Sequence, residues 1–172
     1  MLKAEEYSVV DSLRDGRRIR VRSLKPEDRG ELVAAVNRTS AQSLYRRFFA
    51  AKRDFTEQEV AFFLNVDFIN HVALIAVLEE GDRPVVGGGR YVVVQPGKAE
   101  VAFVVVDPYQ GQGIGAALMR HLIAIARDAG IEELIAEVLP DNHAMLKVFV
   151  KCGLPLATIR RPQVVHVTLQ LT

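Results

Sequence analysis

The sequence lacks the features that mark several large classes of protein. Cys152 is its only cysteine, so an internal disulfide cannot form, and a reducing compartment is expected. No apolar run approaches the roughly 20 residues of a membrane-spanning helix, and the segment from Met1 to Glu6 has no apolar signal-peptide region. A formal net charge of +1 argues against long-range attraction to nucleic acid or to an anionic membrane. We therefore expect a cytoplasmic protein that binds neither.

Two kinds of catalytic site are also missing from the sequence. No pair among the four histidines has the spacing of a metal site, so no bound metal is predicted. No Gly-x-Ser-x-Gly sequence is present to support a serine hydrolase. Any chemistry must therefore come from another motif.

What is present indicates a folded domain with a sizeable core. The chain has 172 residues, of which 49% are apolar and 25% charged, so one domain over 1–172 is expected. Asp15-Gly16 predicts a hairpin turn between the first two strands. Apolar patterns predict further strands over 71–78, 85–94, 98–106, 134–139 and 164–171. Helices are predicted to start at Pro26 and after Asn142, and to cover 43–51, 56–65 and 114–129.

The order of these elements predicts the type of sheet. Three antiparallel strands in succession, followed by strand, helix, strand, helix and strand, indicate an α+β fold around a mixed sheet. Gly87-Gly88-Gly89 interrupts one of these strands. Glycines weaken a strand unless a bulge or a close backbone contact requires them, so one of the two is expected here.

The most informative stretch is Gln110-Gly111-Gln112-Gly113-Ile114-Gly115-Ala116. A strand candidate, Val101 to Val106, precedes it, and an amphipathic segment, Leu118 to Ala129, follows it. This order brings unpaired backbone N–H groups together at the positive end of a helix dipole. Glycines at alternate positions let a bulky anion approach the main chain without meeting a Cβ atom. We predict that this loop binds a pyrophosphate.

Several ligands share glycine loops of this kind. The loop lacks the Gly-Lys-Ser/Thr ending of a phosphate-loop NTPase. Gly111, Gly113 and Ala116 fit the dinucleotide fingerprint G-x-G-x-x-A, and Glu137 follows at about the 20-residue spacing of its acidic partner. However, the segment 107–110 separates the strand from the first glycine, where the dinucleotide turn is abrupt. A glycine-rich connection without any ligand is the remaining alternative.

The loop resembles the Q/R-x-x-G-x-G/A signature of the GNAT superfamily of acyl-CoA-dependent N-acyltransferases, in which it binds the pyrophosphate of coenzyme A. The similarity extends to Ala99-Glu100-Val101 upstream, and to Asp141–Leu146 and Gly153 downstream. Segments 18–28 and 43–49 resemble the branch of bacterial protein lysine acetyltransferases. The resemblance implies the GNAT fold, in which a mixed and mostly antiparallel sheet is flanked by helices on both faces.

The resemblance also implies a reaction and a site. The co-substrate is acetyl-CoA, no metal takes part, and the acceptor is a primary amine in a lysine-bearing protein such as an acyl-CoA synthetase. Glu100 corresponds to the family's general base. Backbone amides near Val104 and Val106 are expected to hold the pantetheine arm and polarise the carbonyl. The positions that correspond to the coenzyme A site are Val104, Val105, Val106, Gln110, Gly111, Gln112, Gly113, Ile114, Gly115, Ala116, Asn142 and Met145.

The residue pattern around Glu100 is compatible with a general base. Freeing the lone pair of a lysine amine, with a pKa of about 10.4, costs roughly 4 to 5 kcal/mol at pH 7. Strand periodicity puts Glu100 on the same face as Val104 and Val106, so it points toward the reacting end if the valines face the thioester arm. Burial among apolar neighbours would make it a better base. A solvated glutamate at the start of a strand is the alternative.

Two positions leave the mechanism open. Asn142 corresponds to a family asparagine that touches coenzyme A, although helix capping explains it equally well. Many members carry, seven residues later, a tyrosine that protonates the departing sulfur, and this chain has Phe149 there. Either the thiolate leaves unassisted, since the pKa of a thiol is near 8.5, or Tyr109 or Tyr45 takes this role.

Three functions therefore stay open. The first is acetylation of protein lysines, and the second is acetylation of a small-molecule amine by the same fold. The third is a non-catalytic acyl-CoA sensor, which the loss of the tyrosine at position 149 favours modestly. A cluster of phenylalanines either packs in the core or lines the acceptor pocket: Phe48, Phe49, Phe62 and Phe63.

Overall fold

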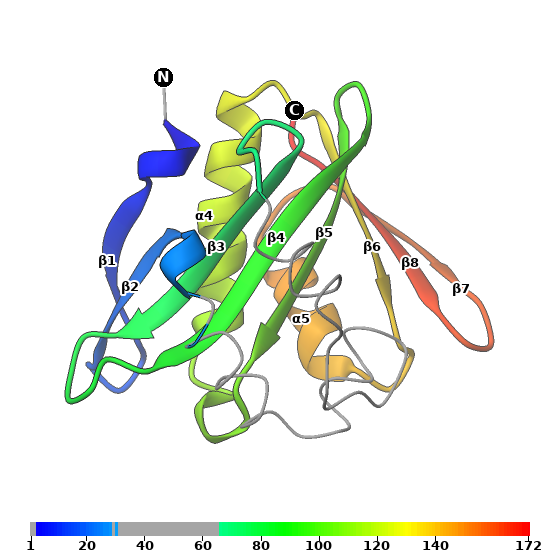
Figure 1. Cartoon of the computed structure of the whole chain (residues 1–172). Coiled ribbons are helices and arrows are strands. Elements are labelled where there is room, and N and C mark those ends of the chain that lie inside the picture. Colours follow the sequence, from blue (N-terminus) through cyan, green and yellow to red (C-terminus); the bar gives the residue numbers. More distant parts are fainter. Residues whose placement is uncertain (1–2, 29, 31–65) are drawn as a thin grey trace.

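A computed structural model of the protein describes residues 3–28, 30 and 66–172 (Figure 1). In chain order the strands are β1 (Ser8–Ser12), β2 (Arg18–Ser23), β3 (His71–Leu78), β4 (Val85–Gln95), β5 (Lys98–Val105), β6 (Glu133–Val138), β7 (Leu156–Arg160) and β8 (Val165–Gln170). The α-helices of this part of the chain are α4 (Ile114–Asp128) and α5 (His143–Lys151). Short 3-10 helices form η1 (Ala4–Glu6), η2 (Pro26–Asp28) and η3 (Asp107–Tyr109).

The strands form one eight-stranded sheet in the order β1-β2-β3-β4-β5-β6-β8-β7. Every neighbouring pair is antiparallel except β5 and β6, which are parallel because α4 carries the chain back across the sheet between them. The mixed and mostly antiparallel sheet is therefore as predicted.

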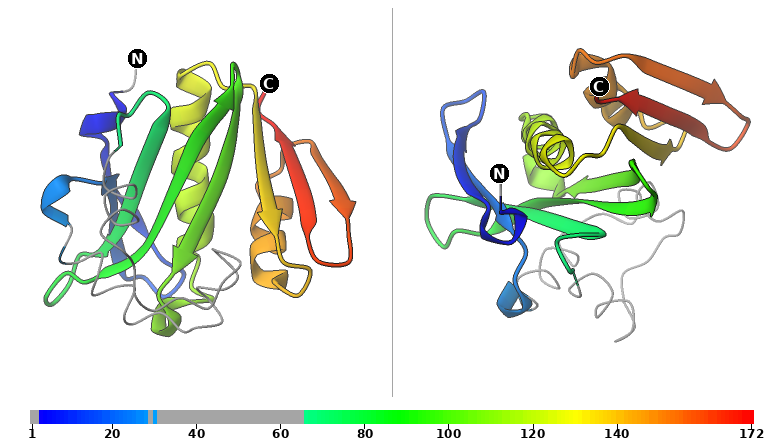
Figure 2. Two further views of the ribbon diagram at one scale, coloured as in Figure 1. Left: turned by 45° about the vertical axis from the view of Figure 1, so that its right-hand side comes forward. Right: turned by 90° about the horizontal axis from the view of Figure 1, so that it is seen from above.

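The parallel pairing between β5 and β6 is short. It joins Lys98–Glu100 to Glu133–Ile135 and then ends. Beyond this point the two strands spread apart, as the lower half of Figure 1 shows. Seen from above, in the right panel of Figure 2, β8 and β7 turn away from the first five strands. The sheet thus opens at its centre, between its only parallel strands in the described part of the chain.

The two α-helices cover the sheet on one side and share its main core. Eight residues of α4 are buried, and α5 contributes Phe149 to the same core. The cluster also includes the inward side chains of the central strands, among them Ala99, Val101 and Phe103 of β5. A smaller cluster, with Ala73, Ile75 and Val106 among its members, lies on the other side of the sheet. The helices predicted over 43–51 and 56–65, with their phenylalanines, lie outside the described residues.

The glycines of β4 are explained by the close approach of α4. A Cβ atom on Gly87 would lie 3.1 Å from Ile114 Cγ2 and 3.1 Å from the carbonyl oxygen of Val104. A Cβ atom on Gly89 would lie 3.0 Å from Leu122 Cδ1. These distances are tighter than ordinary van der Waals contacts, so the glycines let the helix lie directly on the strand. The expected close contact is therefore present.

We expect Gly87→Ala to destabilise the protein, because its new methyl group would press on the β-branched side chain of Ile114 and on a strand carbonyl. Overpacking of this kind costs about 1–3 kcal/mol, which lowers the melting temperature by roughly 2–4 °C per kcal/mol in a protein of this size. Gly88→Ala is the matched control, since the nearest described atom to its Cβ would be Leu74 O at 3.4 Å. Thermal unfolding checks both, and an equal loss at the two positions would contradict the close-packing explanation.

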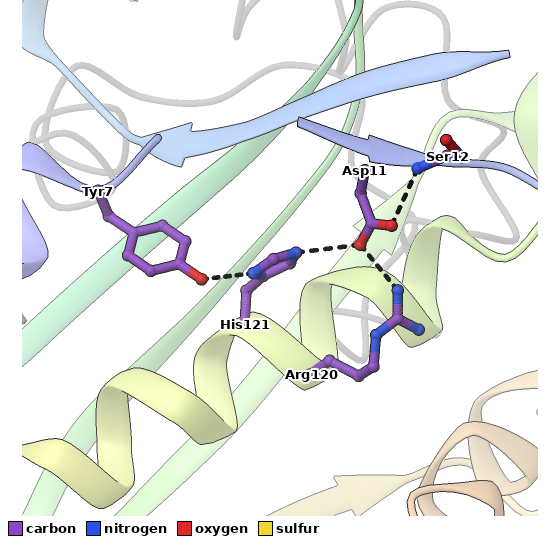
Figure 3. Close-up of polar contacts among 5 residues, drawn as sticks. All are labelled: Tyr7, Asp11, Ser12, Arg120 and His121. Atoms are coloured by element: carbon purple, nitrogen blue, oxygen red, sulfur yellow. Dashed lines mark hydrogen bonds and ion pairs between the residues drawn. The ribbon is translucent and has the colours of Figure 1, made fainter. Parts of the chain in front are cut away.

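A polar network fixes the N-terminal strand to α4 (Figure 3). Tyr7 Oη lies 2.5 Å from His121 Nδ1, and His121 Nε2 lies 3.1 Å from Asp11 Oδ2. Arg120 donates to the same carboxylate oxygen at 2.8 Å. Burial tends to raise the pKa of Asp11, but the hydrogen bonds from Arg120, His121 and the Ser12 amide outweigh it and lower this pKa. The carboxylate therefore stays charged and holds β1 beside the helix.

The predicted elements of the described region agree with the structure to within one residue at most ends. Gly16 adopts a left-handed φ of 90° in the predicted hairpin turn. At Pro26 the described residues show the short helix η2, and the rest of the helix predicted there lies outside them. One difference remains, because strand β7 was not predicted. Strand β7 lies at the edge of the sheet with mostly exposed side chains, so it carries no alternating apolar pattern.

Candidate active site

The glycine loop connects β5 to α4 at the open end of the sheet. Gly111 and Gly113 have φ values of 77° and 96°, in the left-handed region that side chains other than glycine rarely adopt. Gly113 is the N-cap residue of α4, and no side chain caps the helix there. The glycines are therefore required by the backbone path that leads into the helix.

The main-chain amides of this loop have no acceptor in the part of the chain that the structure describes. The first helical hydrogen bond of α4 runs from the Ala117 amide to the Gly113 carbonyl, at 3.0 Å. Within the described residues, the amides of 111–116 donate to no carbonyl or side chain. Several donors at the positive end of a helix dipole form a binding site for an anion such as a phosphate group.

A cavity of about 410 Å³ opens beside this loop. Its walls come from the splayed parts of β5 and β6, from the start of α4, from α5 and from the β1–β2 turn. The strand residues that line it are Val101, Ala102, Phe103, Val104, Val105, Ala136, Glu137 and Val138. The separation of the two strands thus creates an elongated site that starts at the glycine loop and continues along β5.

The charged residues around the cavity are mainly basic. Arg14, Lys147 and Lys151 line it, against a single carboxylate from Glu137 in the described lining. Lys147 and Lys151 are one helical turn apart on α5, so they lie on the same side of that helix. Together with the loop amides, these cations make the site suited to a ligand with several negative charges.

Most of the predicted coenzyme A residues come together at this cavity. Its lining includes Val104, Val105, Gln110, Gly111, Gly113, Ile114, Gly115, Ala116, Asn142 and Met145. Gln110 Nε2 donates to the Val105 carbonyl at 3.0 Å, which ties the loop to the end of β5. Gln112 and Val106 lie outside the lining. Gln112 contacts Arg17 and the Pro108 carbonyl instead.

The hydrogen bonds of β5 decide which of its amides face the cavity. The Val106 amide donates to the Val86 carbonyl of β4 at 2.9 Å, so it belongs to the sheet. Backbone donors alternate sides along an antiparallel strand, and the Val104 amide therefore points toward β4 as well. The amides of Phe103 and Val105 therefore point the other way, toward the opening between β5 and β6. The expectation that the amides near Val104 and Val106 serve the ligand therefore shifts by one residue, a detail of backbone direction that side-chain patterns do not reveal.

Asn142 has the capping geometry that its sequence context suggested. Its side-chain oxygen accepts a hydrogen bond from the Met145 amide at 3.2 Å, as the N-cap of α5. The same side chain is buried and lines the cavity. Capping and contact with a ligand are thus compatible, because the oxygen caps the helix while the amide group has two donors of its own.

Glu100 lies on the predicted face of β5 but is exposed. It follows the alternation of Ala102 and Val104, on the face opposite to the main core. Glu100 is not part of the cavity lining, which ends at Val101 and Ala102. Two residues of a strand span about 7 Å, so Glu100 is the next side chain on its face beyond the cavity. The burial that would strengthen it as a base is absent from the described structure.

The position of the family tyrosine is occupied by a packed aromatic ring. Phe149 is 2% exposed, and its ring stacks on Phe103 with centroids 6.0 Å apart. It lines the cavity but has no proton to give. Tyr109 is the one tyrosine of the described lining, and it has a hydroxyl group. Tyr45 lies outside the described residues.

Sequence reasoning did not single out four basic residues near the site: Arg14, Arg17, Lys147 and Lys151. Arg14 and Arg17 come from the β1–β2 turn, whose sequence shows only that it is a turn. Lys147 and Lys151 are four residues apart on the helix that follows Asn142, and this helical spacing was an available signal.

Two general features of the described part bear on other kinds of site. None of its helices is long and apolar enough to cross a membrane. Its histidines, cysteine and acidic residues form no group of three or more that could hold a metal ion.

Comparison with known proteins identifies the family. The model of the acetyltransferase (GNAT) family matches residues 38–154, which include the glycine loop, β5 and α5. The chain therefore belongs to the GNAT family and is an acetyl-CoA-dependent acetyltransferase.

Individual relatives agree with this assignment. An acetyltransferase of Pseudomonas aeruginosa is 32% identical over 163 residues, which cover 91% of this chain and 87% of the relative. Acetyltransferase Pat of Mycolicibacterium smegmatis is 36% identical over 138 residues, covering 76% of this chain and 40% of Pat. This chain thus spans less than half the length of Pat. A shorter match, 42% identical over 59 residues, covers 34% of this chain and 40% of the ribosomal protein bS18 alanine N-acetyltransferase of Escherichia coli.

The solved structures give the same answer for the fold. The crystal structure of the GNAT domain of S. lividans PAT superposes with a TM-score of 0.86 and 34% sequence identity, covering 95% of this chain and 96% of that domain. The fold of this chain is therefore the GNAT fold.

Proposed function

We propose that the protein transfers the acetyl group of acetyl-CoA to the side-chain amine of a lysine in a protein substrate. The observation that carries this proposal is the cavity between β5 and β6, which joins the loop amides that have no acceptor among the described residues to the free edge of β5. The amides of 111–116 bind the diphosphate, and the cations of α5 add to the attraction. The cavity along β5 accommodates the arm that carries the thioester.

The choice of a protein acceptor is supported by relatives. The PAT domain of S. lividans matches over nearly its whole length, and the E. coli relative is named for acetylating an alanine of a ribosomal protein. The name of the E. coli relative supports an amine on a protein rather than on a free metabolite. The acceptor of this chain is a lysine-bearing protein, and an acyl-CoA synthetase is the first candidate to test.

Within this proposal, the residues of β5 perform the chemistry. The amides of Phe103 and Val105 face the opening and polarise the thioester carbonyl. Glu100 takes the proton from the attacking amine, directly or through a water molecule, because it is the next side chain on its face of β5 beyond the cavity. Phe149 cannot donate a proton, so the thiolate leaves unassisted, as its moderate basicity allows.

The acceptor class is tested by offering acetyl-CoA with three kinds of amine: a lysine-bearing acyl-CoA synthetase, free lysine and a polyamine. We expect at least tenfold higher kcat/KM for the protein acceptor, measured as released thiol and as the mass gain of one acetyl group. The matched control is the same acceptor with its modified lysine replaced by arginine, which should remain unmodified. A free amine that outcompetes every protein acceptor would contradict the proposed acceptor, and tight binding without any turnover would contradict catalysis.

A further inference from the structure

The turn between β1 and β2 is held against the glycine loop, although about 95 residues separate them in sequence. The Arg17 guanidinium donates from Nη2 to the side-chain oxygen of Gln112. The same guanidinium carbon lies 5.7 Å from the centre of the Tyr109 ring, in a cation–π arrangement. Arg17 therefore contacts the loop on both sides of Gly111.

The turn itself is well fixed. The Leu13 amide donates to the Arg17 carbonyl at 2.7 Å, and the Gly16 amide donates to the Leu13 carbonyl at 3.0 Å. Leu13 is buried in the main core. Asp15 accepts from Arg17 Nε at 2.7 Å and from the Arg17 amide at 3.0 Å, and these contacts lower the pKa of Asp15, the amide first among them. Arg17 is thus oriented by its own turn before it reaches the loop.

Arg14 occupies the same turn but faces the cavity. It lies beside Gly113, with its Nε 3.9 Å from the position that a Cβ atom on Gly113 would take. Arg14 lines the cavity, is exposed, and makes no hydrogen bond or ion pair among the described residues. A charged guanidinium is thus held at the mouth of an anion site, with its donors available to a ligand.

We propose that the β1–β2 turn forms a second half of the acyl-CoA site. Arg14 binds a phosphate group of the nucleotide part of the ligand, and Arg17 is a positioning residue that holds Gln112 and Tyr109. This inference rests on the proposed function, in which the cavity beside the glycine loop holds acetyl-CoA. The family model begins at residue 38, so neither arginine belongs to the pattern that identifies the family. The position of these side chains beside the loop carries the inference.

Binding of coenzyme A and of dephospho-coenzyme A, measured by calorimetry, tests the role of Arg14. We expect Arg14→Gln to raise the dissociation constant of coenzyme A about tenfold, as loss of one exposed charge-assisted hydrogen bond implies. Arg18→Gln is the matched control, because Arg18 is exposed on β2 and is not part of the cavity lining. If Arg14→Gln also raises the dissociation constant of dephospho-coenzyme A, Arg14 contacts the diphosphate. If the dissociation constant of dephospho-coenzyme A is unchanged, Arg14 contacts the 3′-phosphate. Both outcomes support the proposal.

The positioning role of Arg17 is tested by a double-mutant cycle. We expect Arg17→Gln and Gln112→Ala each to raise the KM for acetyl-CoA severalfold with little change in kcat. The KM of the double variant should be no higher than that of the single variant with the larger effect. Melting temperatures of the variants show whether the turn stays folded. Multiplying effects in the double variant would overturn the positioning role.

The failure of this inference is distinguishable from the failure of the proposed function. If the wild type binds coenzyme A tightly and Arg14→Gln has the same dissociation constant as Arg18→Gln, the role of Arg14 is wrong while the proposed function still stands. A wild-type protein that binds no coenzyme A would overturn both.

Discussion

Glu100→Gln is expected to lower kcat by two to four orders of magnitude, the usual contribution of a general base. The substitution keeps the size of the side chain and removes only its ability to accept a proton. Because Glu100 lies beyond the cavity lining, we expect the dissociation constant of coenzyme A to change less than twofold. Steady-state rates with a saturating protein acceptor, together with calorimetric binding of coenzyme A, separate the two effects.

The control for this experiment is Glu80→Gln, an exposed residue in the turn between β3 and β4, which should leave both quantities unchanged. The exposure of Glu100 makes the test decisive. If its loss slows turnover, a carboxylate that is exposed in the free enzyme accepts the proton, directly or through a water molecule. Wild-type rates in the Glu100→Gln variant would show that the proton leaves by another route.

Gly113→Ala is expected to weaken the binding of coenzyme A at least tenfold. At a φ of 96°, an alanine is strained by about 1–2 kcal/mol. The loop relieves this strain by changing its backbone path, so that its amides no longer converge on the bound phosphate groups. A steric clash is not the cause, because the nearest atom to the new Cβ would be Arg14 Nε at 3.9 Å. Calorimetry with coenzyme A measures the effect.

The opposite end of the same helix supplies a matched control. Gly130 follows α4 with a φ of 83°, and a Cβ atom added there would meet no atom of the described structure within 4 Å. Gly130→Ala should therefore cost about the same 1–2 kcal/mol of folding stability while leaving coenzyme A affinity unchanged. Equal losses of affinity in the two variants would mean that general destabilisation, rather than the shape of the loop, controls binding.

The parts of the fold that follow from local pattern could be predicted from the sequence. The strand before the glycine loop contains a continuous apolar run, and the helix after the loop repeats apolar residues on one side, so the bounds of both agree closely with the structure. Gly87 and Gly89 indicated a close contact without showing its partner, α4. Strand β7 escaped prediction because an exposed edge strand needs only backbone pairing with β8.

Those parts of the candidate site that consist of neighbouring residues could be predicted from the sequence. Those that depend on contacts between distant segments, or on the direction of a backbone amide, could not. The glycine loop and Asn142 each belong to a short sequence motif that can be recognised without knowledge of the fold. Arg14 reaches the loop only because the first hairpin folds across α4, a contact that no local pattern encodes. The role that we propose for the amides of Phe103 and Val105, instead of those of Val104 and Val106, depends on which side each amide faces, and side-chain identity carries no information about this.

The pairing between β5 and β6 stops after three residues of each strand, and this has a consequence for the stability of the protein when the site is occupied. Past Glu100, the edge of β5 that faces β6 pairs with no strand of the described sheet, so a ligand that lies along this edge takes the place of the missing neighbour. Such a ligand binds only the folded form, and at 100 times its dissociation constant it adds about 2.7 kcal/mol to the free energy of unfolding. The cellular level of the acyl donor would then govern how long the enzyme resists proteolysis as well as how fast it works.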